Sequence, residues 1–253
     1  MKSRVLASCL VLFGVAGHAR AEDSIATDRP DFVESSLTVG NHWVQVETSV
    51  AWERDASVAT YSTPTLFRYG LGQTWELRLE TDGWQRIDAP GQAKVSGMAD
   101  VSLGIKHHLV SSDDGKTSLA WLLHVGLPSG AHAVRGHGAR PSFRLVAEWD
   151  LSDSISAGMM PGVIRDDDGQ GHRYTAGIFG AVLGKAWNDR VRSFVELALP
   201  QIAKRDNGGT VALLDVGSAW LLSNDVQLDA VYSRGLNDRS PDHALGVGLS
   251  FRF

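Results

Sequence analysis

The chain has 253 residues, 43% of them hydrophobic and 21% charged, with 24 basic against 29 acidic residues and a net charge of −5. This acidic balance argues against nucleic acid as a partner. Beyond the first residues, no apolar run approaches the about 20 residues that a membrane helix needs, which excludes a helical membrane protein. A membrane β-barrel remains open, because its strands alternate apolar and polar residues.

The first 21 residues have the layout of a secretory signal peptide. A basic start precedes an apolar run from Val5 to Gly17, and Ala19-Arg20-Ala21 form a small-x-small cleavage site. We expect the mature chain to begin at Glu22 with 21 basic against 29 acidic residues, a net charge of −8, since the signal holds three bases and no acid. Leu6-Ala7-Ser8-Cys9 matches a lipoprotein signal in letters but leaves almost no apolar run ahead of Cys9. That is the only cysteine, so the mature chain is expected to hold no disulfide and no cysteine-based metal site.

From Val44 onward, apolar and polar residues alternate in segments that turn residues separate, which is the pattern of strands with one apolar face. In the eighth segment small residues fall on both faces, so its inward face is not assigned. The pattern predicts twelve strands: Val44–Trp52, Thr65–Tyr69, Trp75–Leu79, Val101–Ile105, Leu119–Val125, Phe143–Trp149, Ile155–Ile164, Tyr174–Trp187, Arg190–Leu199, Val211–Leu221, Val226–Ser233 and His243–Phe253.

The connections alternate in length along the chain. Those after even-numbered strands are short, as at Gly70–Gln73. Those after odd-numbered strands are mostly longer and rich in Gly, Asp and Pro: Glu53–Ala59, the shortest, then Asp82–Ser96, Pro128–Ala139, Arg165–His172, Pro200–Gly209 and Gly235–Asp242. We therefore predict an all-β fold, a transmembrane antiparallel β-barrel of about 12 strands with short periplasmic turns and longer extracellular loops.

The end of the chain fits this interpretation. Unpaired backbone groups in hydrocarbon cost several kcal/mol each, so the last strand is expected to pair with the first. Phe251 and Phe253 would then lie at the periplasmic interface, and we expect them to act as an assembly signal for the barrel assembly machinery. A soluble sandwich also alternates, but the many charges at mid-strand on the polar face argue against it.

Several motifs resemble, in their order along the chain, an outer-membrane family labelled "putative MetA-pathway of phenol degradation". The resemblance covers essentially the mature chain and implies an outer-membrane channel or transporter linked by its label to aromatic compounds. The motifs are Asp28-Arg29-Pro30-Asp31 with Glu34-Ser35, Gln45-Val46-Glu47, Phe67-Arg68-Tyr69-Gly70-Leu71, Glu76-Leu77-Arg78, Gly97 with Asp100 and Lys106, Leu127-Pro128 with Gly130, Gly235-Leu236-Asn237-Asp238, and Ser250-Phe251-Arg252-Phe253.

The predicted lumen is lined by charges of both signs. Nine acids stand against seven bases, so strong anion selectivity is not expected. The charges either line a narrow polar conduit or form an ion-pair network that fills the interior. The acids are Glu47, Glu76, Glu80, Asp100, Glu148, Asp150, Glu196, Asp215 and Asp229, and the bases are Arg68, Arg78, Lys106, Arg144, Arg190, Arg192 and Arg252.

Residues 22–40 precede the first strand and are too polar to face lipid. Asp28, Arg29 and Asp31 are candidates for a plug in the periplasmic mouth, with Arg29 pairing to a lumenal carboxylate such as Glu76 or Glu80. The alternative is a capped turn that starts the first strand, with Pro30 fixing its angle.

We expect a channel or transporter for small solutes in the outer membrane of a Gram-negative bacterium, in contact with outer-membrane lipid. Aromatic or hydrophobic compounds are the class that the resemblance suggests. A closed structural or surface-binding barrel is the alternative. A membrane-embedded hydrolase is disfavoured because there is no G-x-S-x-G and His107 falls near the periplasmic end.

No catalytic residue, metal or cofactor is expected. His124 is expected inside the lumen, His132, His137 and His172 lie in outer loops, and Arg165–Gly169 lacks the spaced ligands of a calcium loop. The oligomeric state stays open.

Overall fold

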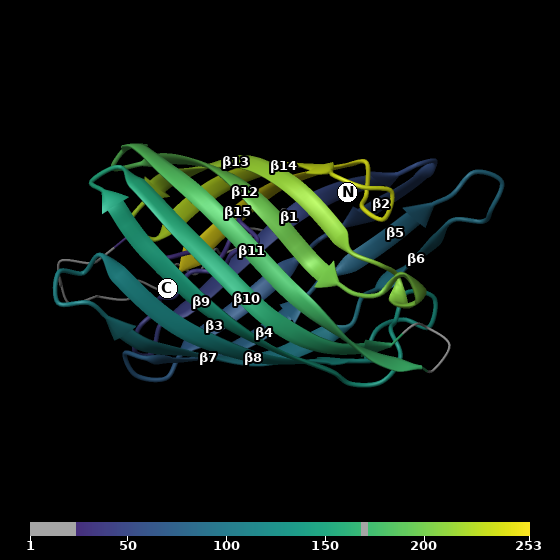
Figure 1. Ribbon diagram of the computed structural model, residues 1–253, viewed down its shortest axis with the longest axis horizontal. Helices are drawn as coiled ribbons and strands as arrows, with labels where there is room; N and C mark the ends of the chain where they lie inside the picture. The colour runs from purple at the N-terminus through teal and green to yellow at the C-terminus, as the bar shows by residue number, and fades with distance from the viewer. Residues whose placement is uncertain (1–23, 168–171) are drawn as a thin grey trace, which may run out of the picture.

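The last strand closes the sheet into a barrel. The structure, a computed structural model, describes residues 24–167 and 172–253, so the predicted signal peptide lies outside the described residues. β15 (His243–Arg252) pairs antiparallel with β1 (Val44–Asp55) from Gln45↔Arg252 to Arg54↔His243. The amide and carbonyl groups of Phe253 bond with those of Val44 at 2.9 Å in both directions. The predicted twelve-stranded closed barrel is confirmed (Figure 1).

Each barrel strand pairs antiparallel with its two neighbours. The twelve in their order around the barrel are β1, β3 (Thr65–Gly70), β4 (Trp75–Thr81), β7 (Val101–Ser111), β8 (Thr117–Leu127), β9 (Arg140–Ser152), β10 (Ile155–Asp167), β11 (Arg173–Asn188), β12 (Val191–Ile202), β13 (Val211–Ser223), β14 (Val226–Gly235) and β15. In Figure 1 the C-terminus lies at the left, at the end of the short turns. We refer to this end as periplasmic.

Three shorter strands continue the barrel wall beyond its outer end: β2 (Val58–Ser62), β5 (Trp84–Asp88) and β6 (Val95–Met98). The two predicted connections Glu53–Ala59 and Asp82–Ser96 join barrel strands as expected, but strand pairing, which was not predicted there, continues through most of the first and about half of the second. Pro64 has no N–H to donate to the ladder. Gly83 has a φ of 66°, and a Cβ there would lie 2.2 Å from the Thr63 carbonyl oxygen. These two residues offset the strands without ending the sheet.

The distribution of residues is inverted relative to a soluble protein. Large apolar side chains lie exposed on the outer surface, with Val50 65% and Val247 51% exposed, while charged residues are buried inside. This pattern is typical of a membrane barrel and excludes the soluble sandwich. Among the described residues, no helix is long and apolar enough to cross a membrane. The 3-10 helix Arg205–Asn207 follows β12.

Two features of the wall complete the fold. In β11, Ala176, Ile178 and the alternate residues after them face inward, as their burial shows, which resolves the strand whose pattern was ambiguous. At the periplasmic end an outer aromatic group stacks Trp75 on His107 at 3.9 Å and Trp121 edge-on. This places His107 on the lipid-facing surface at the height where such girdles form. The role of Phe251 and Phe253 in assembly stays a prediction.

Candidate functional site

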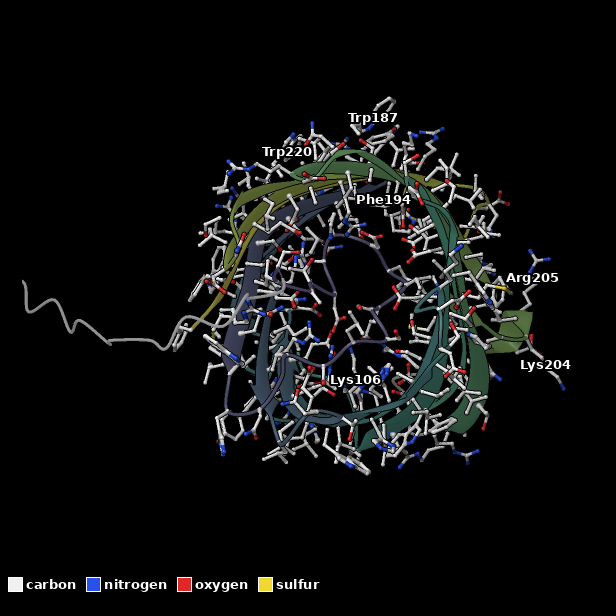
Figure 2. All side chains as sticks on the ribbon, turned by 90° about the vertical axis from the view of Figure 1, so that its left-hand side faces the viewer. Lys106, Trp187, Phe194, Lys204, Arg205 and Trp220 are labelled. Carbon is white, nitrogen blue, oxygen red and sulfur yellow. The ribbon has the colours of Figure 1, made fainter. Side chains whose placement is uncertain are left out.

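The N-terminal segment, residues 24–40, lies inside the barrel and is called the plug here. Near its start, the amide of Ile25 donates to Asn224 in the turn between β13 and β14 at 2.7 Å. Just after its end, the amide of His42 donates to the carbonyl of Gly70, the last residue of β3 before the turn to β4, at 3.1 Å. Both ends are therefore periplasmic, and Figure 2, viewed from that side, shows the segment running inside the barrel.

Lumenal carboxylates hold the plug by its backbone. Carboxylate oxygens accept charge-assisted hydrogen bonds from amide groups, which are stronger than neutral ones. Glu47 accepts from Asp28 and Arg29, both at 3.0 Å; Glu196 from Phe32 and Val33, both at 2.7 Å; Glu148 from Ser36 at 2.6 Å; and Glu76 from Val39 at 3.1 Å. Four predicted lumenal acids thus bind main-chain groups of the plug.

Lumenal bases hold the plug by its acidic side chains. Asp28 lies 2.5 Å from Arg78 and 2.9 Å from Lys106. Glu34 lies 2.7 Å from Arg78 and 2.5 Å from Arg144, and Asp31 lies 2.8 Å from Arg192. Lys106 projects from β7 into the barrel in Figure 2. The plug is therefore bound through both backbone and side chains, by groups of opposite sign.

Arg68 is the centre of this network. Its guanidinium donates to Glu47 at 2.9 Å and to Glu76 at 2.8 Å, and also to the plug carbonyls of Ala26 at 2.7 Å and Leu37 at 3.0 Å. Arg68, Glu47 and Glu76 are at most 1% exposed. Buried charges of this kind are tolerated only when they are paired and hydrogen-bonded. The network therefore depends on the plug to satisfy donors that the wall leaves open.

The middle of the plug packs on an apolar patch of the wall. Val33 is 5% exposed and lies in one cluster with Leu122, Val146 and Met160, and Phe32 packs against it. Glycine makes room for this contact: a Cβ at Gly180 would lie 2.6 Å from Cγ2 of Val33 and 3.0 Å from the Phe32 ring. The small residues on the inner face of β11 thus fit the plug to the wall.

Cavities lie on both sides of the plug. The periplasmic cavity has a volume of about 580 Å³ and is lined by Thr27, Asp31, Arg192 and Gln227 among others. The second, of about 190 Å³, is lined by Asp31, Glu34, Glu80 and Arg144 together with residues near the outer ends of β3 and β4. Asp31 borders both, so the segment separates two openings within one lumen.

The inner wall of β13, β14 and β15 is bonded differently. Asp229 is fully buried, and neither of its carboxylate oxygens meets a hydrogen-bond donor among the described residues. The same holds for one oxygen of Asp215 and the hydroxyl of Ser250. Gln227 donates to the Thr27 hydroxyl at 2.8 Å and thereby links this wall to the plug.

The predicted partners of Arg29 are wrong. Glu76 is bound by Arg68 and Arg78, and Arg29 has no ion pair with Glu76 or Glu80 within 4.0 Å among the described residues. Its guanidinium lies instead beside Gly246, 3.8 Å from the position that a Cβ would take there. Among the described residues, the ion pairs between the plug and the wall are formed by the acids of the plug and not by its arginine.

Asp100 lies at the outer rim, where it anchors the loop between β8 and β9. Its carboxylate accepts from the amides of Gly130 and Gly136, both at 2.9 Å, and pairs with Arg140 at 2.6 Å. Burial alone would raise the pKa of Asp100, but these donors outweigh burial and lower it. A Cβ at Gly97 would lie 2.5 Å from Cβ of Ala131 in this loop. The glycines of two family-like motifs therefore pack the loop against the rim.

Other predicted residues lie away from the plug contacts. Arg190 lies in the turn after β11, and Arg252 pairs with Asp225 at 2.8 Å and lies over the Trp43 ring at the periplasmic end. Lumenal His124 accepts from Arg78 at 3.1 Å. Within the described ranges, no group of three or more His, Cys, Asp or Glu could hold a metal ion. Part of the predicted Arg165–Gly169 loop lies outside these ranges.

Three plug residues, Phe32, Val33 and Glu34, were not predicted as site residues. A usable signal was present: Phe32-Val33 are two adjacent large apolar residues within a polar segment, with an acid on each side. Such a pair in an otherwise polar strand-free stretch indicates an apolar contact elsewhere in the fold.

Comparisons with known proteins agree with this architecture. A family model described as "Putative MetA-pathway of phenol degradation" matches residues 27–253. A search of curated proteins finds no significant match. Among solved structures, an outer-membrane channel from Pseudomonas putida F1 is similar with a TM-score of 0.63 and 14% identity, over 88% of this chain and 99% of that one. The NanC porin gives 0.58 and 12%, over 81% and 98%, and the KdgM porin gives 0.55 and 9%, over 83% and 99%. At these identities the structural likeness shows the fold.

Proposed function

The chain belongs to the family described as "Putative MetA-pathway of phenol degradation". Because its barrel also encloses its own N-terminal segment, we propose that it is an outer-membrane channel for small solutes that the plug holds closed. Similar folds include proteins described as channels and porins. The observation that carries the proposal is the plug itself, which lies between two cavities of one lumen.

The interior of a barrel of about eight strands is filled by the side chains of its own strands, whereas larger barrels enclose a cavity or channel. This barrel instead places glycines on the inner face where the plug packs: added Cβ atoms at Gly158 and Gly180 would lie 3.2 and 2.6 Å from Val33. The space that larger side chains would take at these two positions is occupied by the plug. If the plug moves, that space becomes open lumen, which favours a gated channel over the closed structural barrel.

For the solute, we propose small aromatic or apolar compounds. Displacing Phe32 and Val33 would uncover the lumenal patch of Leu122, Val146 and Met160, which suits an apolar ring. The mixed charges around it argue against strong selection by charge. The description of the family names phenol degradation, which is consistent with an aromatic solute.

The test is planar-bilayer conductance of the mature chain and of a variant that lacks residues 24–36, both shown to be folded by heat-modifiable gel migration. We expect low conductance for the whole chain and a large rise for the variant. Silence of both folded proteins would favour the structural barrel.

The solute class is tested in the same deletion variant by adding phenol. A bound ring in the lumen should reduce the current, and Met160→Gln should weaken this block while leaving the open conductance unchanged. A current that phenol does not alter would contradict the solute class and leave the channel itself standing.

A further inference from the structure

Three basic side chains lie side by side on the lipid-facing surface at the outer end of the barrel. Arg54 of β1 pairs in register with His243 of β15, and His243 with Arg234 of β14. Two residues further toward the periplasm, the same faces carry Trp52, Leu245 and Tyr232, again in register. Leu245 is 50% exposed on the outer surface, so the basic row shares this outward face.

The position of the row along the barrel can be derived from the strand. Ten residues separate Phe253, exposed at the periplasmic end, from His243. At a rise of about 3.3 Å per residue and a tilt of about 40°, they span about 25 Å, which is the height of the apolar band of a membrane barrel. The row therefore lies at the outer boundary of the hydrocarbon, with Trp52 and Tyr232 at the height of an aromatic girdle.

The row is held in place by its own hydrogen bonds. Tyr232 Oη lies 2.6 Å from Nδ1 of His243, and Nη1 of Arg234 donates to Nε2 of His243 at 2.6 Å. Nε of Arg54 donates to the Ala56 carbonyl at 3.0 Å. The three groups are thus positioned before any ligand arrives, which lowers the entropic cost of binding.

The two guanidinium groups of the row lack a counter-ion in the protein. Within the described residues no carboxylate lies within 4.0 Å of Arg54 or Arg234, whereas Arg86, on the same outward rim, pairs with Asp88 at 2.8 Å. The neighbouring carboxylate of Asp242 accepts from the Ala56 amide at 2.9 Å. Unpaired arginines at a membrane boundary are suited to an anion supplied by the membrane.

We propose that Arg54 and Arg234, the latter held in place by His243, bind the phosphate of an outer-leaflet lipid of the lipopolysaccharide type. Guanidinium groups bind phosphate in bidentate fashion, and the apolar surface of Trp52, Leu245 and Tyr232 directly beneath takes an acyl chain. Because an acyl chain can pack on that apolar surface and a free phosphate ion cannot, the site is expected to prefer a phosphate that belongs to a lipid. The site is separate from the lumen and independent of the proposed channel.

The experiment measures binding of bisphosphorylated lipid A to the whole mature chain in detergent by native mass spectrometry. The test variant is Arg54→Ala with Arg234→Ala, and the matched control is Arg86→Ala, which removes an outward arginine that is already neutralised. We expect the affinity of the double variant for lipid A to fall about tenfold or further. The control should bind lipid A as the wild type does.

Two further arms identify the source of the phosphate. Dephosphorylated lipid A should bind wild type as weakly as the double variant binds the phosphorylated lipid, and excess inorganic phosphate should not displace the bound lipid. Equal binding of lipid A by wild type and double variant would overturn the proposal, as would displacement by inorganic phosphate. Heat-modifiable migration of both variants shows that the barrel is folded.

Discussion

Two parts of the lumen wall carry inward-facing charged side chains. In one part these side chains are paired with the plug, and in the other they lack such partners among the described residues. On β1, β3, β4 and β7, the wall around Arg68 binds its charges into a network with Asp28 and Glu34 of the plug. We call this the paired wall. On β13, β14 and β15, Asp229 and Asp215 retain carboxylate oxygens without a donor among the described residues, and we call this the open wall.

The difference indicates which side of the lumen fixes the plug. A buried network in which every member is satisfied is stable, but one that loses a member is worse than an apolar contact. The paired wall therefore holds the plug in an all-or-none manner. Asp229 and Asp215 on the open wall form no ion pair with the plug among the described residues, so this side contributes less to holding it.

The largest effect is expected from Asp28→Asn, which removes the plug acid that contacts three buried bases. Breaking a buried pair from one side costs about 3 to 5 kcal/mol, and here that cost is relieved by release of the plug. In a Ser36→Cys background, where the side chain at position 36 is buried in wild type, maleimide labelling should accelerate about 100-fold or more.

The matched control for this prediction is Asp31→Asn, the same substitution in the same segment. Its partner Arg192 has a side chain that is 35% exposed, so the pair contributes about 1 kcal/mol or less and labelling should change little. Equal acceleration by both substitutions would contradict the role given to the paired wall.

A smaller effect is expected from Val33→Ala at the apolar patch. Loss of two methyl groups from a buried contact costs about 1 to 2 kcal/mol, so labelling at position 36 should rise about tenfold. Leu37→Ala is the control, since Leu37 is 46% exposed and its truncation should leave labelling unchanged. An unchanged labelling rate in Val33→Ala would contradict the claim that the apolar contact helps to hold the plug.

The smallest effect is expected from Asp229→Asn on the open wall. Because the carboxylate has no donor partner among the described residues, removing its charge relieves a desolvation cost instead of breaking a pair. Labelling at position 36 should stay at the wild-type rate, and the urea midpoint of unfolding should stay equal or rise. An increase in labelling like that for Asp28→Asn would show that the two walls are equivalent.

The barrel was predictable because its signal is local. Strict alternation from Val44 to Phe253, together with turn lengths, determines strand number and closure, since both follow from period and edge pairing. The strand extensions were missed where Pro64 and Gly83 mark offsets that resemble loop ends. The inward face of β11 was ambiguous because glycine and alanine carry no polarity that distinguishes the faces.

The plug was predictable in kind and not in detail. The polar composition of residues 22–40 indicated a lumenal segment with Asp28, Arg29 and Asp31 as plug candidates, and opposite charge suggested that Arg29 pairs with a lumenal carboxylate. Charge type alone does not give distance, and the anchors are Asp28 and Glu34 with bases from four different strands. The amides of Phe32 and Val33 donate to the carboxylate of Glu196, and because every residue except proline has such an amide, no residue type reveals these bonds.

The central claim, that movement of the plug opens the lumen, is tested most directly by a reversible cross-link. Cγ2 of Val33 lies 2.6 Å from the position of a Cβ at Gly180, which is within disulfide reach for Val33→Cys with Gly180→Cys, and the sole cysteine, Cys9, lies in the predicted signal peptide. In an Asp28→Asn background, we predict that the oxidised protein is silent in planar bilayers and that reduction raises its conductance to that of the variant lacking residues 24–36. Equal conductance of the oxidised and reduced protein, with the disulfide verified by mass, would contradict the account.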